Sequence, residues 1–150
     1  MAATTTNSTE YGNQVAVPPT PLDPTQLHGR MRVAHFEFTS ITGDANSLLN
    51  IVKMPQGKVR ILEVTLVKSA FGEGATLDIG HTGYTNLAGT AVAASENAFA
   101  TALDIDDTAN LTQVIDVAVE SRGGFTIQGK IETAAATAET LSGWFTYVVD

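Results

Sequence analysis

Apolar and polar residues alternate with a period of two along much of the chain after residue 30. This period predicts β-strands, because successive side chains of a strand point to opposite faces of a sheet. The alternation is strictest in 125–133, where Phe125, Ile127 and Ile131 alternate with polar residues. The strands that the pattern predicts cover residues 32–40, 48–53, 59–68, 75–79, 113–121, 125–133 and 141–149.

Glycine, proline and small polar residues separate these segments. Pro55 and Gly57, for example, occupy favoured positions of a four-residue turn. The expected turns and loops are 41–47, 54–57, 72–74, 80–89 and 123–124. Residues 91–103, AVAASENAFATAL, leave helix and strand-with-loop as open alternatives, since alanine favours helices but no helical period is evident.

Some seven or eight short strands without helix–strand alternation predict an all-β protein, an antiparallel β-sandwich. With eight strands over roughly 120 residues a jelly roll is the leading architecture. An immunoglobulin-like sandwich is second: its Cys…Trp…Cys pattern is absent, but many such domains lack it. We expect residues 31–150 to form this jelly-roll-like domain and residues 1–30 to form an extended, Pro-rich N-terminal arm.

The alternation also assigns faces. In 59–68 we expect Leu62, Val64 and Leu66 to share one face, with Glu63 and Thr65 on the other. In 113–121 the expected inward residues are Ile115, Val117 and Val119. In the last strand, Trp144 and Val148 are expected on the face opposite Phe145, Tyr147 and Val149.

The first 30 residues differ from the rest. They are rich in Thr, Asn and Ser and include Pro18, Pro19, Pro21 and Pro24, which exclude a helix or a central strand. Two interpretations stay open: a disordered tail, or an extended arm that becomes ordered on a neighbouring subunit. For an arm, the expected contact residues are Val15, Val17, Pro18, Pro19 and Leu22.

Composition excludes several classes of function. The chain has no cysteine, so disulfides, thiolate zinc sites and thiol nucleophiles are ruled out. Its net charge is −8 and Lys and Arg form no run, which argues against nucleic-acid and membrane partners. No apolar run reaches the ~20 residues of a membrane helix, and the N-terminus does not resemble a signal peptide. We therefore expect a protein that is intracellular or delivered within a particle.

Few residues suggest site chemistry. Asp104, Asp106 and Asp107 offer oxygen ligands for Ca²⁺, but the glycine and glutamate of an EF-hand loop are missing, so a solvated acidic turn is expected instead. His81 has no neighbouring histidine and is expected to be a surface residue of its loop. We expect no metal and no cofactor.

No catalytic constellation is evident. No serine lies in a G-x-S-x-G motif, no H-x-H metal pair suggests a cupin enzyme, and no phosphate-binding glycine loop precedes a helix. Aromatic residues leave two alternatives. Phe71, Tyr84 and Trp144 suit the stacking of sugars, whereas Trp144 with Tyr147 suits a subunit interface, which we favour because Trp144 would otherwise face water.

One resemblance extends from residue 59 to the C-terminus. The segment VRILEVTLVKSAFGEGATLDIGHTGYTN carries Ile61, Val64 and Leu66, then TLDIG, then the loop GYTN, and the chain closes with LSGWFTYVVD. This pattern resembles small jelly-roll structural proteins of tailed bacteriophages, which act as head decoration (cement) or head-fibre base proteins. The N-terminal arm lies outside the resemblance.

The resemblance implies a homotrimer on the outside of a capsid, at three-fold or quasi-three-fold positions, with the major capsid protein as partner. Such a protein is assembled in the cytoplasm of the bacterial host, and an extended arm over the shell would suit it. We therefore expect a non-enzymatic virion structural protein. The alternative from another class is a glycan- or receptor-binding sandwich, such as a fibre head or adhesin domain, that uses Tyr84, Trp144 and the acidic loops.

Overall fold

The computed structural model describes residues 30–43, 45–133 and 136–149 of the chain. The expected arm contacts Val15, Val17, Pro18, Pro19 and Leu22 lie outside the described residues. The strands are β1 (Met31–Gly43), β2 (Leu48–Met54), β3 (Gly57–Lys68), β4 (Thr76–His81), β5 (Tyr84–Thr85), β6 (Ala91–Val92), β7 (Ser95–Asp104), β8 (Leu111–Ser121), β9 (Phe125–Ile131) and β10 (Ala136–Val149).

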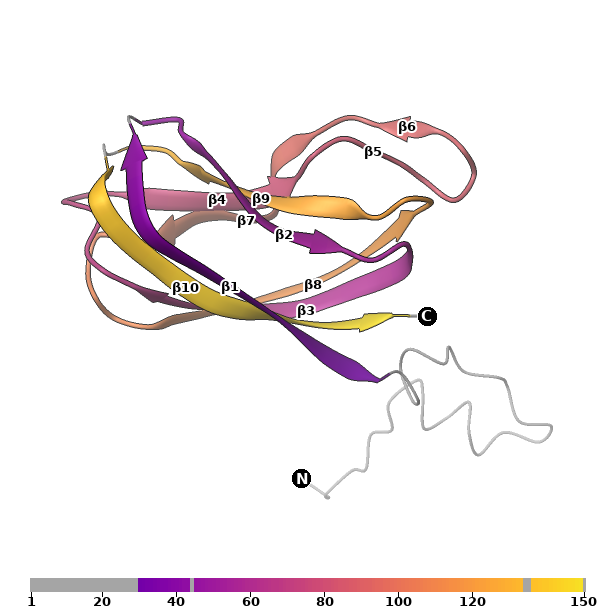
Figure 1. Ribbon diagram of the computed structural model, residues 1–150, viewed down its shortest axis with the longest axis horizontal. Coiled ribbons are helices and arrows are strands. Elements are labelled where there is room, and N and C mark those ends of the chain that lie inside the picture. Colours follow the sequence, from indigo (N-terminus) through magenta and orange to yellow (C-terminus); the bar gives the residue numbers. More distant parts are fainter. Residues whose placement is uncertain (1–29, 44, 134–135, 150) are drawn as a thin grey trace, which may run out of the picture.

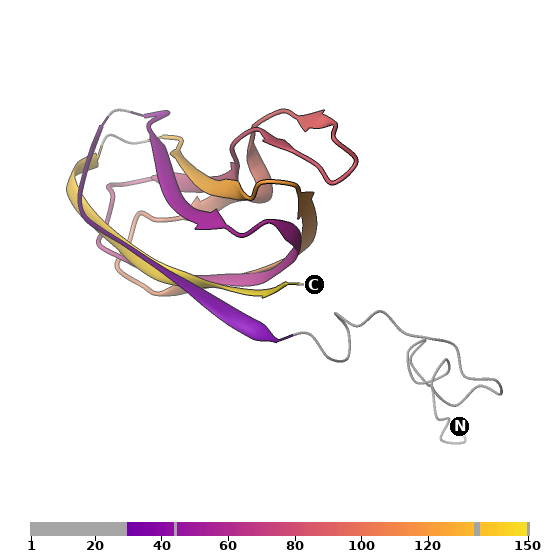
Figure 2. The same cartoon turned by 45° about the vertical axis from the view of Figure 1, so that its right-hand side comes forward.

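Two four-stranded sheets face one another and enclose the core (Figure 1). The first sheet has the order β1-β10-β3-β8 and the second sheet the order β2-β9-β4-β7, and every pairing within them is antiparallel. The short β5–β6 hairpin stands off the sandwich at the end where the C-terminus lies (Figures 1 and 2). The predicted antiparallel sandwich is confirmed.

The topology is that of a rolled hairpin. The first strand pairs with the last, β2 with β9, β3 with β8, and β4 with β7. This nested pairing, split over two sheets, is the jelly-roll arrangement and not the immunoglobulin one. No helix that could cross a membrane occurs in the ranges that the structure describes.

Several strands differ in extent from the prediction. The ambiguous segment 91–103 contains β6 and most of β7, and the expected loop 80–89 contains β5. Strand β1 continues to Gly43 through register shifts at Phe38/Ile41 and Ile41/Thr42. Bulges of this kind let a strand continue through residues that favour turns. The end of the strand predicted at residue 40 was therefore too early.

A bulge also corrects the predicted face of β3. The register of β3 shifts between Ile61 and Glu63 against both β8 and β10, so the inward phase changes at Leu62. Val59 and Ile61 are fully buried before the shift and Val64 after it, while Leu62 is only half-buried. The prediction for Val64 and Leu66 is confirmed, and that for Leu62 is wrong.

The core lies between the sheets. It includes Phe36 and Phe145, whose ring centroids are 5.7 Å apart, packed with aliphatic residues of both sheets. The predicted inward residues Ile115, Val117 and Val119 all pack against this cluster. The largest fully buried side chains are Phe145, Met54, Ile61, Leu66, Leu77, Ile79, Ile105, Ile127, Ile131, Leu141, Val59 and Val64.

Candidate interaction surface

The outer face of the first sheet exposes four large apolar side chains among polar ones. Met31 and Val114 on it are 69% and 68% exposed, and Val33 and Val67 are also exposed. Their strands bury the opposite phase: Val33 alternates with Ala34, and Val114 precedes Ile115, both of which pack against the core. We call Met31, Val33, Val67, Val114 and Trp144 together the apolar face.

Cross-strand pairing sets how the residues of this face lie relative to one another. Met31 lies opposite Val148, and Val33 lies opposite Thr146. Thr146 in turn pairs with Glu63, and Glu63 with Val114, so one row of side chains crosses all four strands from Val33 to Val114. The two middle members of this row are polar, so Thr146 and Glu63 separate the valines at the two edges of the sheet.

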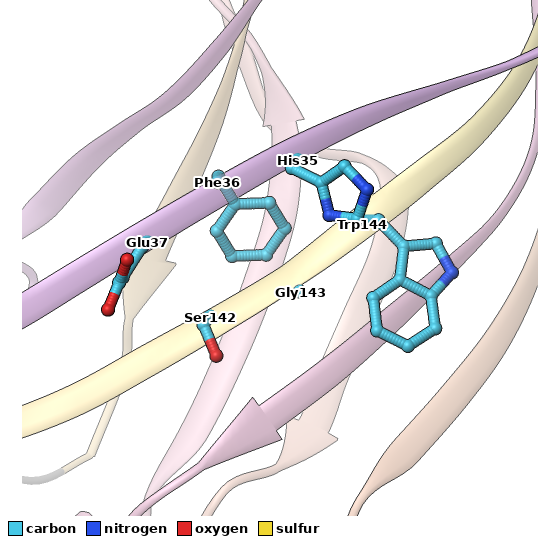
Figure 3. A pocket seen from close by; sticks show the side chains of 6 residues that line it. All are labelled: His35, Phe36, Glu37, Ser142, Gly143 and Trp144. Carbon is cyan, nitrogen blue, oxygen red and sulfur yellow. The ribbon is translucent and has the colours of Figure 1, made fainter.

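Trp144 lies near the centre of this face. Its indole is 6.0 Å from the His35 ring, centroid to centroid, on the neighbouring strand. Figure 3 shows both rings beside a shallow depression that Phe36, Glu37, Ser142 and Gly143 also line. The predicted position of Trp144, on the opposite face from Phe145, is confirmed: Phe145 is fully buried and Trp144 is half-buried.

Polar groups on the same sheet are paired with one another. Thr146 Oγ1 donates to Glu63 Oε1 at 3.3 Å, and the Thr65 and Thr112 hydroxyls are 3.1 Å apart. Arg60 Nε donates to Asp116 Oδ1 at 2.8 Å, and this contact holds the pKa of the Asp116 carboxyl below its ordinary value. These contacts satisfy several polar groups that lie among the apolar residues of this sheet.

The outer face of the second sheet is different. Lys130 Nζ lies 2.9 Å from Glu96 Oε2 and 3.0 Å from Glu132 Oε1, and these carboxylates raise the pKa of Lys130. Gln128 Nε2 donates to Asn50 Oδ1 at 3.0 Å on the same face. Leu48, at 50%, is the one exposed large apolar residue on the described strands of this sheet. The described strands of the first sheet thus expose more large apolar side chains than those of the second.

The structure separates the aromatic residues proposed for one site. Tyr147 packs against the core from the inner side of β10, whereas Trp144 lies on the outer side. Phe71 is buried, and Tyr84 packs on Phe125 at 5.7 Å in the β5–β6 hairpin. Phe71, Tyr84 and Trp144 therefore do not form a common platform for a sugar.

His81 is buried, which corrects the expectation of a surface residue. It ends β4 on the inner face, with ring centroids 5.1 Å from Tyr84 and 5.6 Å from Phe99. Its Nδ1 lies 3.0 Å from the carbonyl oxygen of Thr82. Sequence reasoning missed this because it placed residue 81 in a loop, whereas β4 continues through it.

The acidic cluster is held by protein groups. Lys68 Nζ, on a side chain that is 1% exposed, donates to both Oδ1 and the carbonyl oxygen of Asp107 at 2.7 Å. This contact lowers the pKa of the Asp107 carboxyl, while a hydrogen bond shared with Asp104 raises the pKa of Asp106. Over the described ranges, no group of three or more acidic or histidine side chains is placed to hold a metal ion.

Comparisons with known proteins address the fold. No protein-family model matches the chain, and no curated protein matches it. A chain of the capsid of Ralstonia phage GP4 matches with a TM-score of 0.62 at 16% identity, over 87% of this chain and 90% of that one. This chain shares its fold with chains of phage capsids.

Two further capsid structures agree. A chain of the cyanophage Pam1 capsid asymmetric unit gives a TM-score of 0.60 at 14% identity, covering 83% of this chain and 88% of that chain. A chain of the acidic stable capsid structure of Helicobacter pylori bacteriophage KHP30 gives 0.55 at 18% identity, covering 82% and 90%. Because both coverages are high in each case, the matched chains are similar in length to this one.

The apolar face had a sequence signal. Val33, Val67 and Val114 occupy the phase of their strands that alternation assigns to solvent, where polar residues are expected. Each is unremarkable by itself, since scattered surface valines are common. Only the strand order shows that β1 and β8, at opposite edges of one sheet, expose these residues on the same face.

Proposed function

We propose that this protein is a non-enzymatic virion structural protein that decorates and cements the outside of a phage head as a homotrimer. Its partner would be the major capsid protein, and it would be made in the cytoplasm of the bacterial host. Two observations support the proposal: the jelly-roll fold shared with phage capsid chains of similar length, and the apolar face.

The apolar face carries the argument. A sheet that exposes Met31, Val33, Val114 and Trp144 on one face buries them favourably against another subunit, at about 25 cal/mol per Å² of apolar area. In a trimer this face meets a different surface of the next subunit, because three-fold contacts are head-to-tail. Stable interfaces of this kind bury on the order of 1,600 Å² in total.

The protein would cement the shell by bridging neighbouring capsid subunits. A trimer that contacts several capsid subunits at once gains affinity from multivalency, and it resists their separation under internal pressure. The arm (residues 1–30) adds contacts in this proposal, with Val15, Val17 and Leu22 as apolar anchors on the shell. No chemistry is required of the protein.

Purified heads of the encoding phage test the proposal. Heads lacking the protein should take up the full-length chain in a density gradient, and the loaded heads should release DNA at a higher temperature than unloaded heads. A full-length variant with Val15, Val17 and Leu22 changed to Ser should bind more weakly. Failure of the wild-type chain to associate with heads would contradict the proposal, and unchanged binding of the variant would contradict the role of the arm.

A further inference from the structure

The fold gathers positive charge that is scattered in the sequence. Of the eight Lys and Arg residues, all but Lys68 and Lys130 lie at one end of the sandwich. This is the end where β1 begins and where β2 and β10 finish, marked by the C label in Figure 1. We call it the basic end, and its cationic residues are Arg30, Arg32, Lys53, Lys58, Arg60 and Arg122.

The opposite end is acidic. Its loops and strand ends carry Glu73, Asp104, Asp106, Asp107, Glu132 and Glu139 among the described residues. Lys68, the cation nearest these loops, is already bound to Asp107. A chain with a net charge of −8 therefore has a strong charge asymmetry along its long axis, which the sequence order does not reveal.

A depression lies within the basic end. It is lined by Arg32 of β1, Tyr147 of β10, Lys53 and Met54 of β2, Pro55 and Gln56 of the following turn, and Gly123 of the β8–β9 turn. Neither Arg32 nor Lys53 forms an ion pair with any residue that the structure describes, whereas Arg60 and Lys130 do. Two cations beside a phenol and an amide, in one hollow, suit a carboxylate.

We propose that the basic end docks on an acidic protein surface, with the depression at Arg32 and Lys53 accepting a carboxylate side chain. This inference deepens the proposed function and rests on it, since the partner surface would belong to the capsid shell. The basic end then faces the shell and the acidic end faces solvent. The 29 residues before Arg30 join the sandwich at this same end, so the arm starts where the shell would be.

An acidic protein fits better than a nucleic acid. Duplex DNA carries one charge per ~1.7 Å, and binding normally requires many unopposed cations along a stripe. Here Asp116 engages Arg60, and Glu120 lies opposite Lys58, so acidic groups interrupt the basic end. The two cations of the depression are enough to meet one carboxylate but do not form such a stripe.

The test measures retention of the full-length protein on immobilised poly-L-glutamate and on duplex DNA, from 20 to 300 mM salt. The double variant Arg32→Gln/Lys53→Gln should bind poly-L-glutamate about tenfold more weakly than wild type and with a shallower salt dependence. The control Thr108→Glu/Asn110→Asp makes the same change in net charge on exposed residues of the acidic end and should bind as wild type does, apart from a small general effect.

Each outcome decides the inference. Stronger retention of wild type on DNA than on poly-L-glutamate would overturn the inference in favour of a nucleic acid. Equal losses of retention in the variant and the control would also overturn it, because net charge alone would then explain the binding. No retention on poly-L-glutamate would also overturn it. The same variants added to phage heads separate the two proposals. If wild type and Arg32→Gln/Lys53→Gln bind heads equally, the docking role of the basic end is contradicted and the proposed function is not. Absence of wild type from heads contradicts the proposed function.

Discussion

Gly143 shows how a single position fixes the packing of two strands. It lies opposite Phe36 on β1 and Leu66 on β3, and a Cβ there would clash with the carbonyl oxygen of Thr65 and lie 3.1 Å from Cζ of Phe36. The Phe36 ring covers the space that a side chain would take.

Replacing this glycine should therefore destabilise the fold. Gly143→Ala is expected to lower the free energy of unfolding by about 1–3 kcal/mol, as overpacked core positions do, measured by urea denaturation. The control is Gly123→Ala, where a Cβ meets nothing within 4 Å; it should change stability by less than about 0.5 kcal/mol. Equal effects of the two changes would contradict this account of Gly143.

The Lys68–Asp107 contact makes a prediction about pH. The lowered pKa of Asp107 means that its contribution to stability is present above the ordinary carboxyl pKa of 3.8 and is lost as pH falls through the lower folded value. Asp107→Asn should lower Tm at neutral pH, because the buried ammonium of Lys68 loses its counter-ion. The difference in Tm from wild type should shrink as the pH approaches 2.

Asp106→Asn is the matched control for that experiment. The pKa of Asp106 is raised by its hydrogen bond with Asp104, so protonation favours the fold, and any stability that Asp106 contributes is lost as pH rises. Its amide variant should therefore not lower Tm at neutral pH. If Asp106→Asn lowered Tm as much as Asp107→Asn does, the decrease in Tm would come from disturbing the loop and not from losing the Lys68–Asp107 ion pair.

For single residues, the sequence predicted which side chains of a regular strand point inward, but not where a bulge changes that alternation. Alternation placed Val64, Leu66, Phe145 and Val119 correctly, because each belongs to an uninterrupted run. It failed at Leu62, where a bulge shifts the inward phase by one residue. A bulge depends on how neighbouring strands pair, and local composition carries no record of that pairing.

Among the elements, the β5–β6 hairpin depends on a small set of contacts. Tyr84 packs edge-on against His81 and at a tilt against Phe125, and the amide of Arg122 donates to the carbonyl oxygen of Thr85 at 2.9 Å. The hairpin contributes little to the two main sheets. It should therefore open without unfolding the sandwich.

Tyr84→Ala is expected to release this hairpin. The amides of Asn86 and Arg122, which donate to Thr90 and Thr85, should exchange with solvent about tenfold faster or more, while amides of β3 keep their protection. Hydrogen exchange followed by NMR provides the measurement. Unchanged exchange at both amides would show that Tyr84 does not anchor the hairpin.

The elements themselves were largely predictable. Strict alternation and Gly- or Pro-containing turns gave β2, β3, β4, β8 and β9 to within a few residues. Segment 91–103 stayed ambiguous because alanine suits a helix, yet β7 forms there by pairing with β4. Tertiary pairing thus overrode local propensity.

For the whole molecule, the sequence indicated a jelly-roll-like sandwich but not its surfaces. Strand order decides which residues meet on the outside: it unites Met31, Trp144 and Val114 on the first sheet and collects the cations at one end. The apolar face and the basic end are properties of topology, so composition, with its low charged fraction and net charge of −8, concealed both.

The mass of the full-length protein in solution, measured by light scattering, tests most directly whether the apolar face joins subunits. The account predicts the mass of three 15.7 kDa chains, and a shift to monomer in Met31→Gln/Val114→Gln with the fold retained by circular dichroism. The control Leu48→Gln/Leu87→Gln removes two exposed apolar residues elsewhere and should remain trimeric. A monomeric wild type, or a trimer that survives the first pair of substitutions, would contradict the account.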